Sequence, residues 1–359
     1  MVKLKIRALT LHISVPQGIK ESELEKLLSD KTNLLLNSAE KLEAETGIEV
    51  WSARISLHSM QDNLIDEAIA TLKKYPNVRA MIYERKVSEM DIDLLKKVTK
   101  EGMYAAIKVE HHGELEKLAR AIERVSEENP EHATRFAAEL SGESLETAYF
   151  PLSLHGGGKE DKFTLALLYP NDAMLIPEEI AKSLEIVLEK FYEKISLFLK
   201  EGLLGTKISG IDYSLSPWME ESVAKLIQEK GKCRLERAGC LGEVWEVNRV
   251  LQGIARKRMG IGFNEVMLPL SEDDELKSLV SQGKLGIRDF LLYSSVCVAG
   301  LDMIPLSTSS RELREILQAA YAIARTKQRP YGVRLILVKN ADGKVRLGGF
   351  GDVPVLVKY

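Results

Sequence analysis

The chain has 359 residues, 50 of them basic and 53 acidic, which gives a formal net charge of −3 at pH 7. This near balance, with no basic stripe that includes aromatic residues, argues against a nucleic-acid partner. No apolar run reaches the roughly 18 residues that cross a bilayer, so no membrane partner is expected either.

The first third of the chain alternates between predicted strands and predicted helices. The strands are rich in β-branched residues, and the helices carry leucine at helical spacing. In chain order we predict strand 4–15, helix 21–46, strand 48–57, helix 63–74, strand 78–83, helix 91–100, strand 104–109 and helix 114–128. Because the connections are short, this alternation predicts an α/β protein with a mostly parallel sheet and helices outside, either open or closed into a barrel.

The rest of the chain is less regular. Glycines at 156–158 predict a hairpin between strands 148–155 and 163–169, which is followed by the longest helix, 177–204. Further predicted elements are strand 208–215, helices 218–230, 243–259, 274–282 and 309–326, and strand 332–338. We expect a single domain over residues 1–359, with an alternative boundary at 142–147.

The long helix and the cysteines bear on assembly and location. Helix 177–204 is apolar on more than one face, which predicts either core burial or the interface of a homodimer or higher homo-oligomer. Three cysteines and no signal sequence predict a reducing, cytoplasmic location. The abundance of Glu and Lys over Gln leans toward a thermophilic source.

Polar residues that follow strands are the first candidates for a site, because ligands of parallel α/β proteins gather at the carboxyl ends of strands. Asp212 and Ser214 lie where a predicted strand passes into a helix, and Ser222 lies near the start of that helix. Serine hydroxyls and free N–H groups there could bind an anion, or could simply cap the helix.

Carboxylates in apolar sequence form a second group of candidates. Asp302 lies in an apolar run, where burial is costly unless a partner is present. Asn264 and Glu265 also stand beside apolar residues. Four side chains could hold a divalent cation through oxygen ligands, namely Asp212, Glu265, Glu272 and Asp302. They could equally divide acid and base roles, so the cofactor stays unknown, with a divalent cation as a candidate.

Cationic and nucleophilic residues complete the candidates. Arg7 and Arg54 lie on early strands, where an inward guanidinium would clamp a carboxylate or phosphate and an outward one would be solvated. His155, beside three glycines, is a candidate for pocket chemistry or for a hydrogen bond within its turn. Cys297 is either a nucleophile or a buried structural cysteine.

Several segments together resemble one family. They are Phe150-Pro151, His155, 210–215, 222–223, 298–304, 348–350 and 353–355. The family is an uncharacterised prokaryotic one, catalogued as a domain of unknown function, whose fold is like that of pyruvate formate-lyase. The resemblance runs from Ile6-Arg7 to the last strand. It implies a closed α/β barrel of about ten strands in two parallel halves, with helices outside and a loop threaded into the interior.

These observations favour a non-radical enzyme that acts on a small anionic metabolite inside the barrel. Arg7 and Arg54 would orient the anion, and Ser214 would hydrogen-bond it. Asp212, Glu265 or Asp302 would serve as acid, base or metal ligand. The alternative is a ligand-binding or regulatory protein that senses an amino acid or related metabolite, so catalysis itself is left open.

The resemblance also suggests a lesser alternative, glycyl-radical catalysis. Residues 346–350 are similar to the radical-bearing loop, with Gly349 as the radical site and Cys297 as the interior cysteine. Against this, the chain is much shorter than such enzymes, and a glycine-rich turn also arises in an ordinary hairpin.

Overall fold

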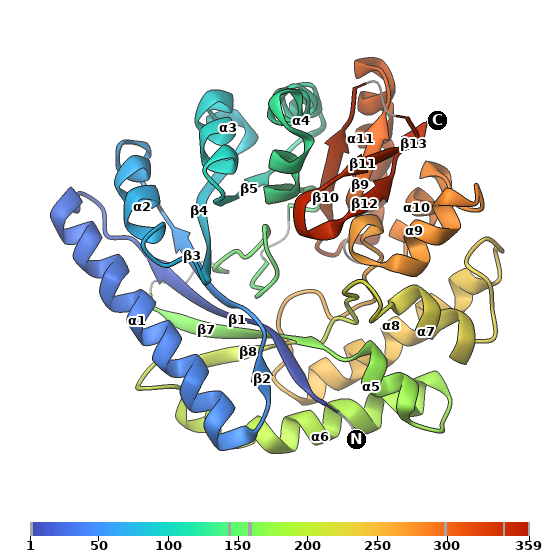
Figure 1. Ribbon diagram of the computed structural model, residues 1–359, viewed down its shortest axis with the longest axis horizontal. Coiled ribbons are helices and arrows are strands. Elements are labelled where there is room, and N and C mark those ends of the chain that lie inside the picture. The colour runs from blue at the N-terminus through green and yellow to red at the C-terminus, as the bar shows by residue number, and fades with distance from the viewer. Residues whose placement is uncertain (1–2, 143–144, 157–159, 298–299, 340–341, 358–359) are drawn as a thin grey trace.

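The computed structural model describes residues 3–142, 145–156, 160–297, 300–339 and 342–357 (Figure 1). Residues 157–158 of the predicted hairpin turn and 298–299 of the resembling segments therefore lie outside the described residues. The first part of the chain alternates strands and helices as predicted. Its elements are β1 (Lys5–Ser14), α1 (Glu21–Thr46), β2 (Glu49–Val50), β3 (Ala53–His58), η1 (Asp62–Leu64), α2 (Ile65–Leu72), β4 (Val78–Lys86), η2 (Val87–Glu89), α3 (Ile92–Lys100), β5 (Tyr104–Lys108), η3 (His112–Glu114), α4 (Leu115–Glu128), η4 (Pro130–Arg135) and β6 (Phe136–Glu139).

The second part repeats strand and helix with longer irregular connections. Its elements are β7 (Lys162–Leu168), α5 (Pro170–Leu175), α6 (Ile180–Glu201), β8 (Ile208–Asp212), α7 (Val223–Lys230), α8 (Cys240–Lys257), η5 (Leu270–Glu272), α9 (Asp274–Ser281), α10 (Ile287–Ser294), β9 (Leu301–Ser307), α11 (Ser310–Lys327), β10 (Gly332–Leu337), β11 (Lys344–Arg346), η6 (Gly348–Phe350), β12 (Asp352–Pro354) and β13 (Leu356–Val357).

The strands form a large mixed sheet, and β11 and β12 form a separate hairpin. The sheet has 11 strands in the order β13-β9-β10-β6-β5-β4-β3-β1-β7-β8, with β2 also paired to β1. The strands β1, β3, β4, β5 and β6 run parallel, whereas β1–β7 and β10–β6 pair antiparallel. The α/β class is therefore confirmed. Among the described residues the end strands β13 and β8 do not pair, so the pairings do not form the expected closed barrel.

The predicted hairpin before β7 is wrong. Residues 145–156 form no strand, and β7 pairs with β1 and β8 instead. In Figure 1 this segment lies as a green loop in the middle of the molecule, surrounded by strands and an outer ring of helices. Hydrogen bonds from Thr10 Oγ1 to Ala148 O (3.0 Å) and from Ser56 Oγ to Ser153 O (2.5 Å) hold it against β1 and β3.

Buried apolar side chains from both parts of the chain form one contiguous cluster, which includes Leu9, Ile107, Leu165 and Leu335. The single-domain prediction is compatible with that cluster and stays a prediction. Helix α6 buries Phe191, Phe198 and Leu199 and exposes Leu197. Core packing thus accounts for most of its apolar residues, and the homo-oligomer stays a prediction.

Two further features concern location. No helix among the described residues is long and apolar enough to cross a membrane. Cys233 and Cys240, whose Cα atoms are 5.2 Å apart, form a disulfide across the connection between α7 and α8. The odd cysteine count did not predict this pairing, and the reducing, cytoplasmic location stays a prediction.

Candidate functional site

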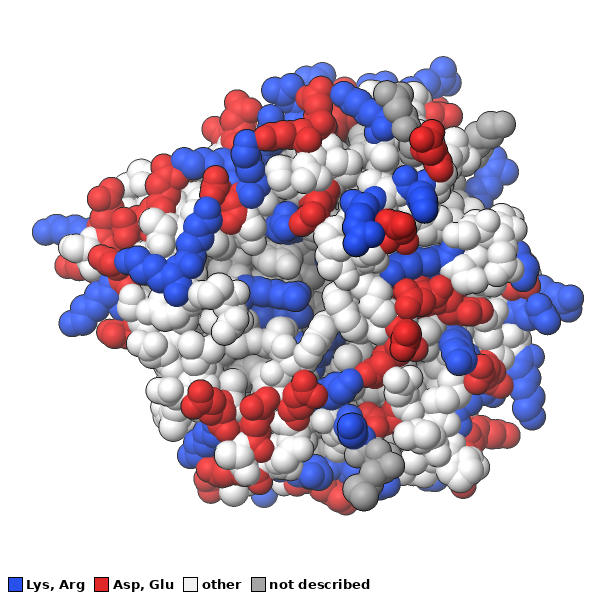
Figure 2. Space-filling view, in the orientation of Figure 1, with Lys and Arg blue, Asp and Glu red and all other residues white. Residues whose placement is uncertain are grey.

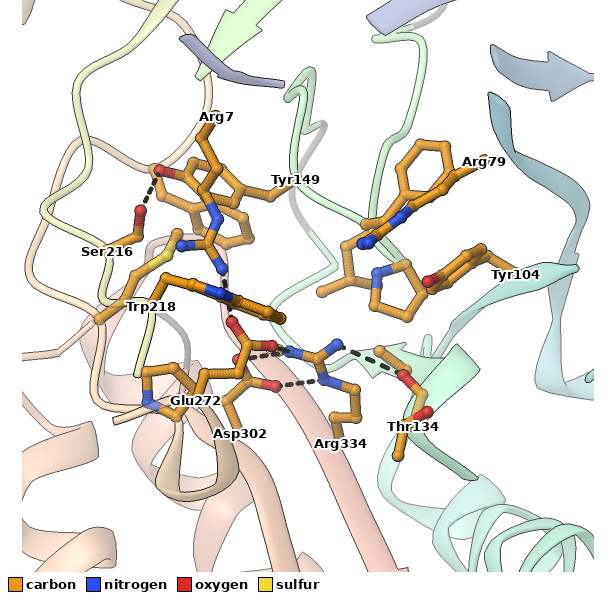
Figure 3. Close-up of a pocket in the computed structure, with 18 of the residues that line it drawn as sticks. Arg7, Arg79, Tyr104, Thr134, Tyr149, Ser216, Trp218, Glu272, Asp302 and Arg334 are labelled. Carbon is orange, nitrogen blue, oxygen red and sulfur yellow. Dashed lines mark hydrogen bonds and ion pairs between the residues drawn. The ribbon is translucent and has the colours of Figure 1, made fainter. Parts of the chain in front are cut away.

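A cavity lies in the middle of the molecule between the two parts of the sheet. Charged side chains on its wall are Arg7, Arg54, Arg79, Arg334, Glu272 and Asp302. Aromatic ones are Trp51, Tyr104, Tyr149, Phe150, Trp218, Phe263 and Phe350. We call this the central cavity (Figure 3). Figure 2 shows basic side chains within the hollow at the centre of this face.

Strand register explains why two of the arginines meet. Arg54 on β3 and Arg79 on β4 are register partners in a parallel pair, so both project to the same face. Like charges on neighbouring strands repel each other. The sheet itself therefore places two cations side by side at the cavity wall.

The other two arginines are joined through carboxylates (Figure 3). Arg7 Nη2 lies 2.5 Å from Glu272 Oε2, and Arg334 Nη2 lies 2.9 Å from Glu272 Oε1. Arg334 also holds Asp302 with both Nε (2.6 Å) and Nη2 (2.9 Å). Its strand partner in the β9–β10 register is that same Asp302. These four residues form one buried chain of ion pairs, which we call the Arg7–Asp302 chain.

Burial and pairing set the protonation of this chain. Burial alone would raise the pKa of Glu272, but Arg334 and Arg7 outweigh it and hold that pKa below its usual value. For Asp302 burial dominates over its pairing with Arg334, so its pKa is raised. Glu272 is thus ionised at neutral pH, whereas Asp302 is the carboxylate of the pair that more readily takes a proton.

Arg54 lacks such a partner. It is 5% exposed, and the hydrogen bond found among the described residues runs from its Nε to Ser52 Oγ (2.9 Å). Its Cζ lies 5.1 Å from the centre of the Phe150 ring. Burial, followed by the charges of Arg79 and Arg7, lowers the pKa of Arg54 to about 9. Within the described residues neither Arg54 nor Arg79 contacts a carboxylate, so the cavity carries four guanidinium groups against two carboxylates.

Aromatic rings close the cavity around Arg7. Its Cζ lies 5.7 Å from the Trp51 ring and 5.6 Å from the Trp218 ring, which also contact each other. Phe350 packs edge-on against Trp218 at 5.6 Å. Rings over a cation lower the local dielectric constant and add cation–π attraction. A charged ligand in this cavity would therefore interact strongly with the arginines.

The loop at 145–156 supplies part of the wall. The Tyr149 hydroxyl lies 3.0 Å from Ser216 Oγ, in the segment after β8. Tyr149 and the neighbouring Phe150 both line the cavity. Hydrogen bonds therefore fix the loop to both parts of the sheet, and the cavity wall is held on both sides.

Asp212 lies outside the cavity wall and serves the backbone. Its carboxylate accepts hydrogen bonds from Thr147 Oγ1 (2.7 Å), Ser214 Oγ (2.6 Å) and the N–H groups of Ser214, Phe263 and Asn264. Burial raises its pKa despite these donors. Asp212, Ser214 and Asn264 are therefore close together, as a structural junction of three segments.

We expect Asp212→Asn to lower the free energy of unfolding by about 2–4 kcal/mol, because an amide nitrogen would face N–H donors in a buried site. Urea denaturation measures this. As a matched control, Asp289→Asn, where a partly buried carboxylate accepts a hydrogen bond from Gly286 N at the start of α10, should cost about 1 kcal/mol at most. An equal loss in both variants would contradict the junction.

The other predicted residues fall in separate places. Glu265 is paired with Lys327 (2.9 Å) and Arg329 (2.7 Å). Cys297 is buried, with its Sγ 3.0 Å from Val266 O, and is not part of the cavity wall. Ser222 caps α7 through a hydrogen bond from Lys225 N.

The four carboxylates proposed as metal ligands divide into two groups. Glu272 and Asp302 belong to the Arg7–Asp302 chain, whereas Asp212 and Glu265 are bound elsewhere. No group of three or more His, Cys, Asp or Glu side chains within the described ranges has the arrangement of a metal site. The structure therefore does not bring the predicted ligand set together.

Sequence reasoning missed Arg79 and Arg334, which complete the charge of the cavity. Arg334 stands among apolar residues of a predicted strand, just as Arg54 does, so the same signal could have identified it. Arg79 carries the same signal in predicted strand 78–83, but its place beside Arg54 follows only from the register with β3.

Comparison with known proteins gives a consistent result. The model of the family described as "Uncharacterised ACR (DUF711)" matches residues 113–344. The UPF0210 protein of Lactiplantibacillus plantarum is 28% identical over 229 residues, which cover 57% of this chain and 50% of that protein. Its counterpart in Pyrobaculum arsenaticum is 28% identical over 261 residues, or 67% and 56% of the two chains.

A third relative, the UPF0210 protein of Lachnospira eligens, is 32% identical over 166 residues, or 43% of this chain and 36% of that one. Across the three relatives this chain covers between 36% and 56% of their own length. The names of these relatives state no activity.

Proposed function

This chain belongs to the DUF711 family, and from the charge of its central cavity we propose that it is an enzyme acting on a small anionic metabolite bound there. The observation that supports the proposal is Arg54, a buried guanidinium without a carboxylate partner among the described residues. A buried cation is stable only when something pairs with it. A ligand carboxylate or phosphate is the partner that Arg54 and Arg79 fit.

Each charged residue of the cavity then has a role. Arg54 and Arg79 bind the anion, and Arg7 and Arg334 fix the carboxylates beside it. Asp302, whose pKa is raised by burial, exchanges a proton with the substrate as general acid or base. The aromatic rings exclude water from the reacting groups.

The proposed interior site also fits a closed barrel of the pyruvate formate-lyase type. Isolated bridges Ile211↔Gly260, Leu215↔Val266 and Met219↔Asp273 continue the sheet beyond β8. The same segment reaches β9, because Ser271 Oγ donates to Met303 O at 2.6 Å. We propose that residues 260–273 join β8 to β9 and complete the barrel, as one domain.

A binding protein without catalysis is the second candidate. The observation that favours it is that both carboxylates of the cavity are already engaged with arginines, which leaves no unpaired base among the described wall residues. Such a protein would hold the anion and release it unchanged.

For radical catalysis, Cys297 would have to leave its hydrogen bond to Val266 O and reach the cavity.

The test is an anion screen by thermal unfolding with acetate, succinate, inorganic phosphate and glycerol phosphate. We expect succinate or a phosphate to bind, and a ligand at a hundredfold excess over its Kd stabilises the folded state by about 2.7 kcal/mol. Acetate, with a single charge, should act only weakly. No stabilisation by any of these anions would overturn the proposal.

Asp302→Asn separates the two candidates. In an enzyme it should still bind the best anion, because a negative charge has left the cavity, while turnover followed by NMR falls at least about 100-fold. If wild type binds the anion without converting it and the variant binds equally, the binding protein is the better description.

A further inference from the structure

A second cavity lies at the opposite edge of the sheet. Ser14, His58, Lys86 and Lys108 are the last residues of β1, β3, β4 and β5, and all four line it. Because β7 runs antiparallel to β1, the carboxyl ends of β7 and β8 lie at the other edge, near the central cavity. The parallel strands β1, β3, β4 and β5 thus present their carboxyl ends to this second cavity, which is where α/β proteins bind ligands.

His155 supplies an unpaired acceptor at the wall of this second cavity. The residue is 4% exposed, and its Nε2 lies 3.0 Å from Glu160 O, which can only accept a hydrogen bond. The proton is therefore on Nε2, and Nδ1 carries a lone pair. Nδ1 is buried and has no hydrogen-bond partner among the described residues. Burial and the nearby His58 lower the pKa of His155, so the lone pair is present at neutral pH.

Hydrogen bonds fix the side chains of His58 and Glu84 next to His155. His58 Nδ1 lies 2.7 Å from Glu84 Oε2, and His58 Nε2 lies 3.2 Å from His12 Nδ1. The His155 ring stands edge-on to His58, with centroids 4.8 Å apart. Burial alone would raise the pKa of Glu84, but His58 and Lys108 lower it to about 2. The site therefore offers one fixed carboxylate and one neutral imidazole acceptor.

The charge of this cavity differs from that of the central one. Three acidic residues and three basic residues line it: Glu84, Glu89, Glu110, Arg85, Lys86 and Lys108. Lys108 lies 2.6 Å from Glu84, and Lys86 lies 2.9 Å from Glu110, so positive and negative groups alternate along the wall. The side chains of Lys108 and Lys86 are 38% and 46% exposed, and such pairs stabilise a fold little, so the two ammonium groups can turn to a ligand while Glu84 stays bound to His58.

A balanced wall with alternating charges matches a ligand that carries one charge of each sign. We propose that this cavity, which we call the histidine cleft, is a second binding site, for a free amino acid. The ligand ammonium group donates to Nδ1 of His155 beside Glu84, and the ligand carboxylate meets Lys108. This site does not depend on the anion proposed for the central cavity.

The test is calorimetric titration of the full chain with glycine, L-serine, succinate and 1,4-diaminobutane. We expect glycine or L-serine to bind saturably. His155→Phe keeps the ring and removes the acceptor, so it should weaken that binding at least about tenfold. His112→Phe, at an exposed histidine on η3, should leave it unchanged, as should saturation with succinate.

Lys108→Met provides a second variant if His155→Phe does not fold, and it should weaken amino-acid binding to a similar extent by removing the partner of the carboxylate. The proposal is overturned if neither amino acid binds, if the diamine or succinate competes with it at the cleft, or if a folded His155→Phe protein binds as tightly as wild type. Loss of succinate binding alone would concern the central cavity and not this site.

Discussion

Replacing Arg54 by methionine should make the protein more stable and abolish anion binding. Burial, with the charges of Arg79 and Arg7, lowers the pKa of Arg54 well below its usual value, to about 9, in the folded protein. A shift of this size means that the charged guanidinium lowers the free energy of unfolding by about 5 kcal/mol. Methionine fills similar space without the charge. Allowing for the lost hydrogen bond to Ser52, we expect a net gain of about 2–4 kcal/mol.

The size of this stability difference depends on pH. Arg54 has a folded pKa below its unfolded one, so its cation destabilises the fold fully below about pH 9. That penalty fades as the pH rises from there toward the unfolded pKa. Urea denaturation at pH 7 should therefore show the difference between wild type and Arg54→Met at its full size.

The same variant should bind the best anion at least about 100-fold more weakly, because a buried charge-assisted hydrogen bond is lost. Arg249→Met is the matched control. This exposed arginine on α8 also lies over an aromatic ring, that of Trp245, but it is not part of the cavity wall. It should change stability by less than about 0.5 kcal/mol. A destabilised Arg54→Met protein that still binds the anion would contradict the account.

Replacing Glu272 by glutamine should have the opposite effect on stability. Glu272 is the anion shared by Arg7 and Arg334, and all three side chains are buried. Its removal leaves two buried guanidinium groups short of a partner. Breaking such a buried pair costs about 3–5 kcal/mol, which a denaturation curve resolves easily.

This prediction also has a pH dependence. Arg334 and Arg7 overcome the effect of burial and keep the pKa of Glu272 below its usual value. The ionised carboxylate therefore stabilises the fold above its unfolded pKa, and this stabilisation is lost as the pH falls through the lower folded pKa. The gap between wild type and Glu272→Gln should narrow in acid.

Glu246→Gln is the control for Glu272, because Glu246 lies exposed on α8 beside Arg249. It should change stability by less than about 0.5 kcal/mol. If Glu272→Gln were as stable as wild type, the Arg7–Asp302 chain would not hold the cavity together. Opposite signs for Arg54 and Glu272 are the signature of a cavity with excess positive charge.

The strands and helices at the start of the chain could be predicted because each one carries its own periodic pattern. The segment at 145–156 could not, since its apolar residues are buried inside the molecule on several sides and imitate a strand. Strand β6 has four residues, too few for a pattern. The partner of β7 is β1, and a pairing over such a distance leaves no local signal.

The candidate site was predicted only in part, because the sequence shows which charges lie on apolar strands but not which residues they meet. Arg7 and Arg54 stand out as charges on apolar strands, and the structure places both in the central cavity. Asp212 stood out equally well, yet its carboxylate bonds backbone N–H groups. A single sequence shows that a carboxylate is buried but not which partner it meets. That Arg79 lies beside Arg54 could be known only from the strand register.

The most direct test of the central claim is a crystal structure of wild type with the best-binding anion from the thermal screen. The account predicts anion oxygens within hydrogen-bond distance of the Arg54 and Arg79 guanidinium groups, with Glu272 still held between Arg7 and Arg334. An anion bound only at the surface, or in the histidine cleft with an empty central cavity, would contradict it.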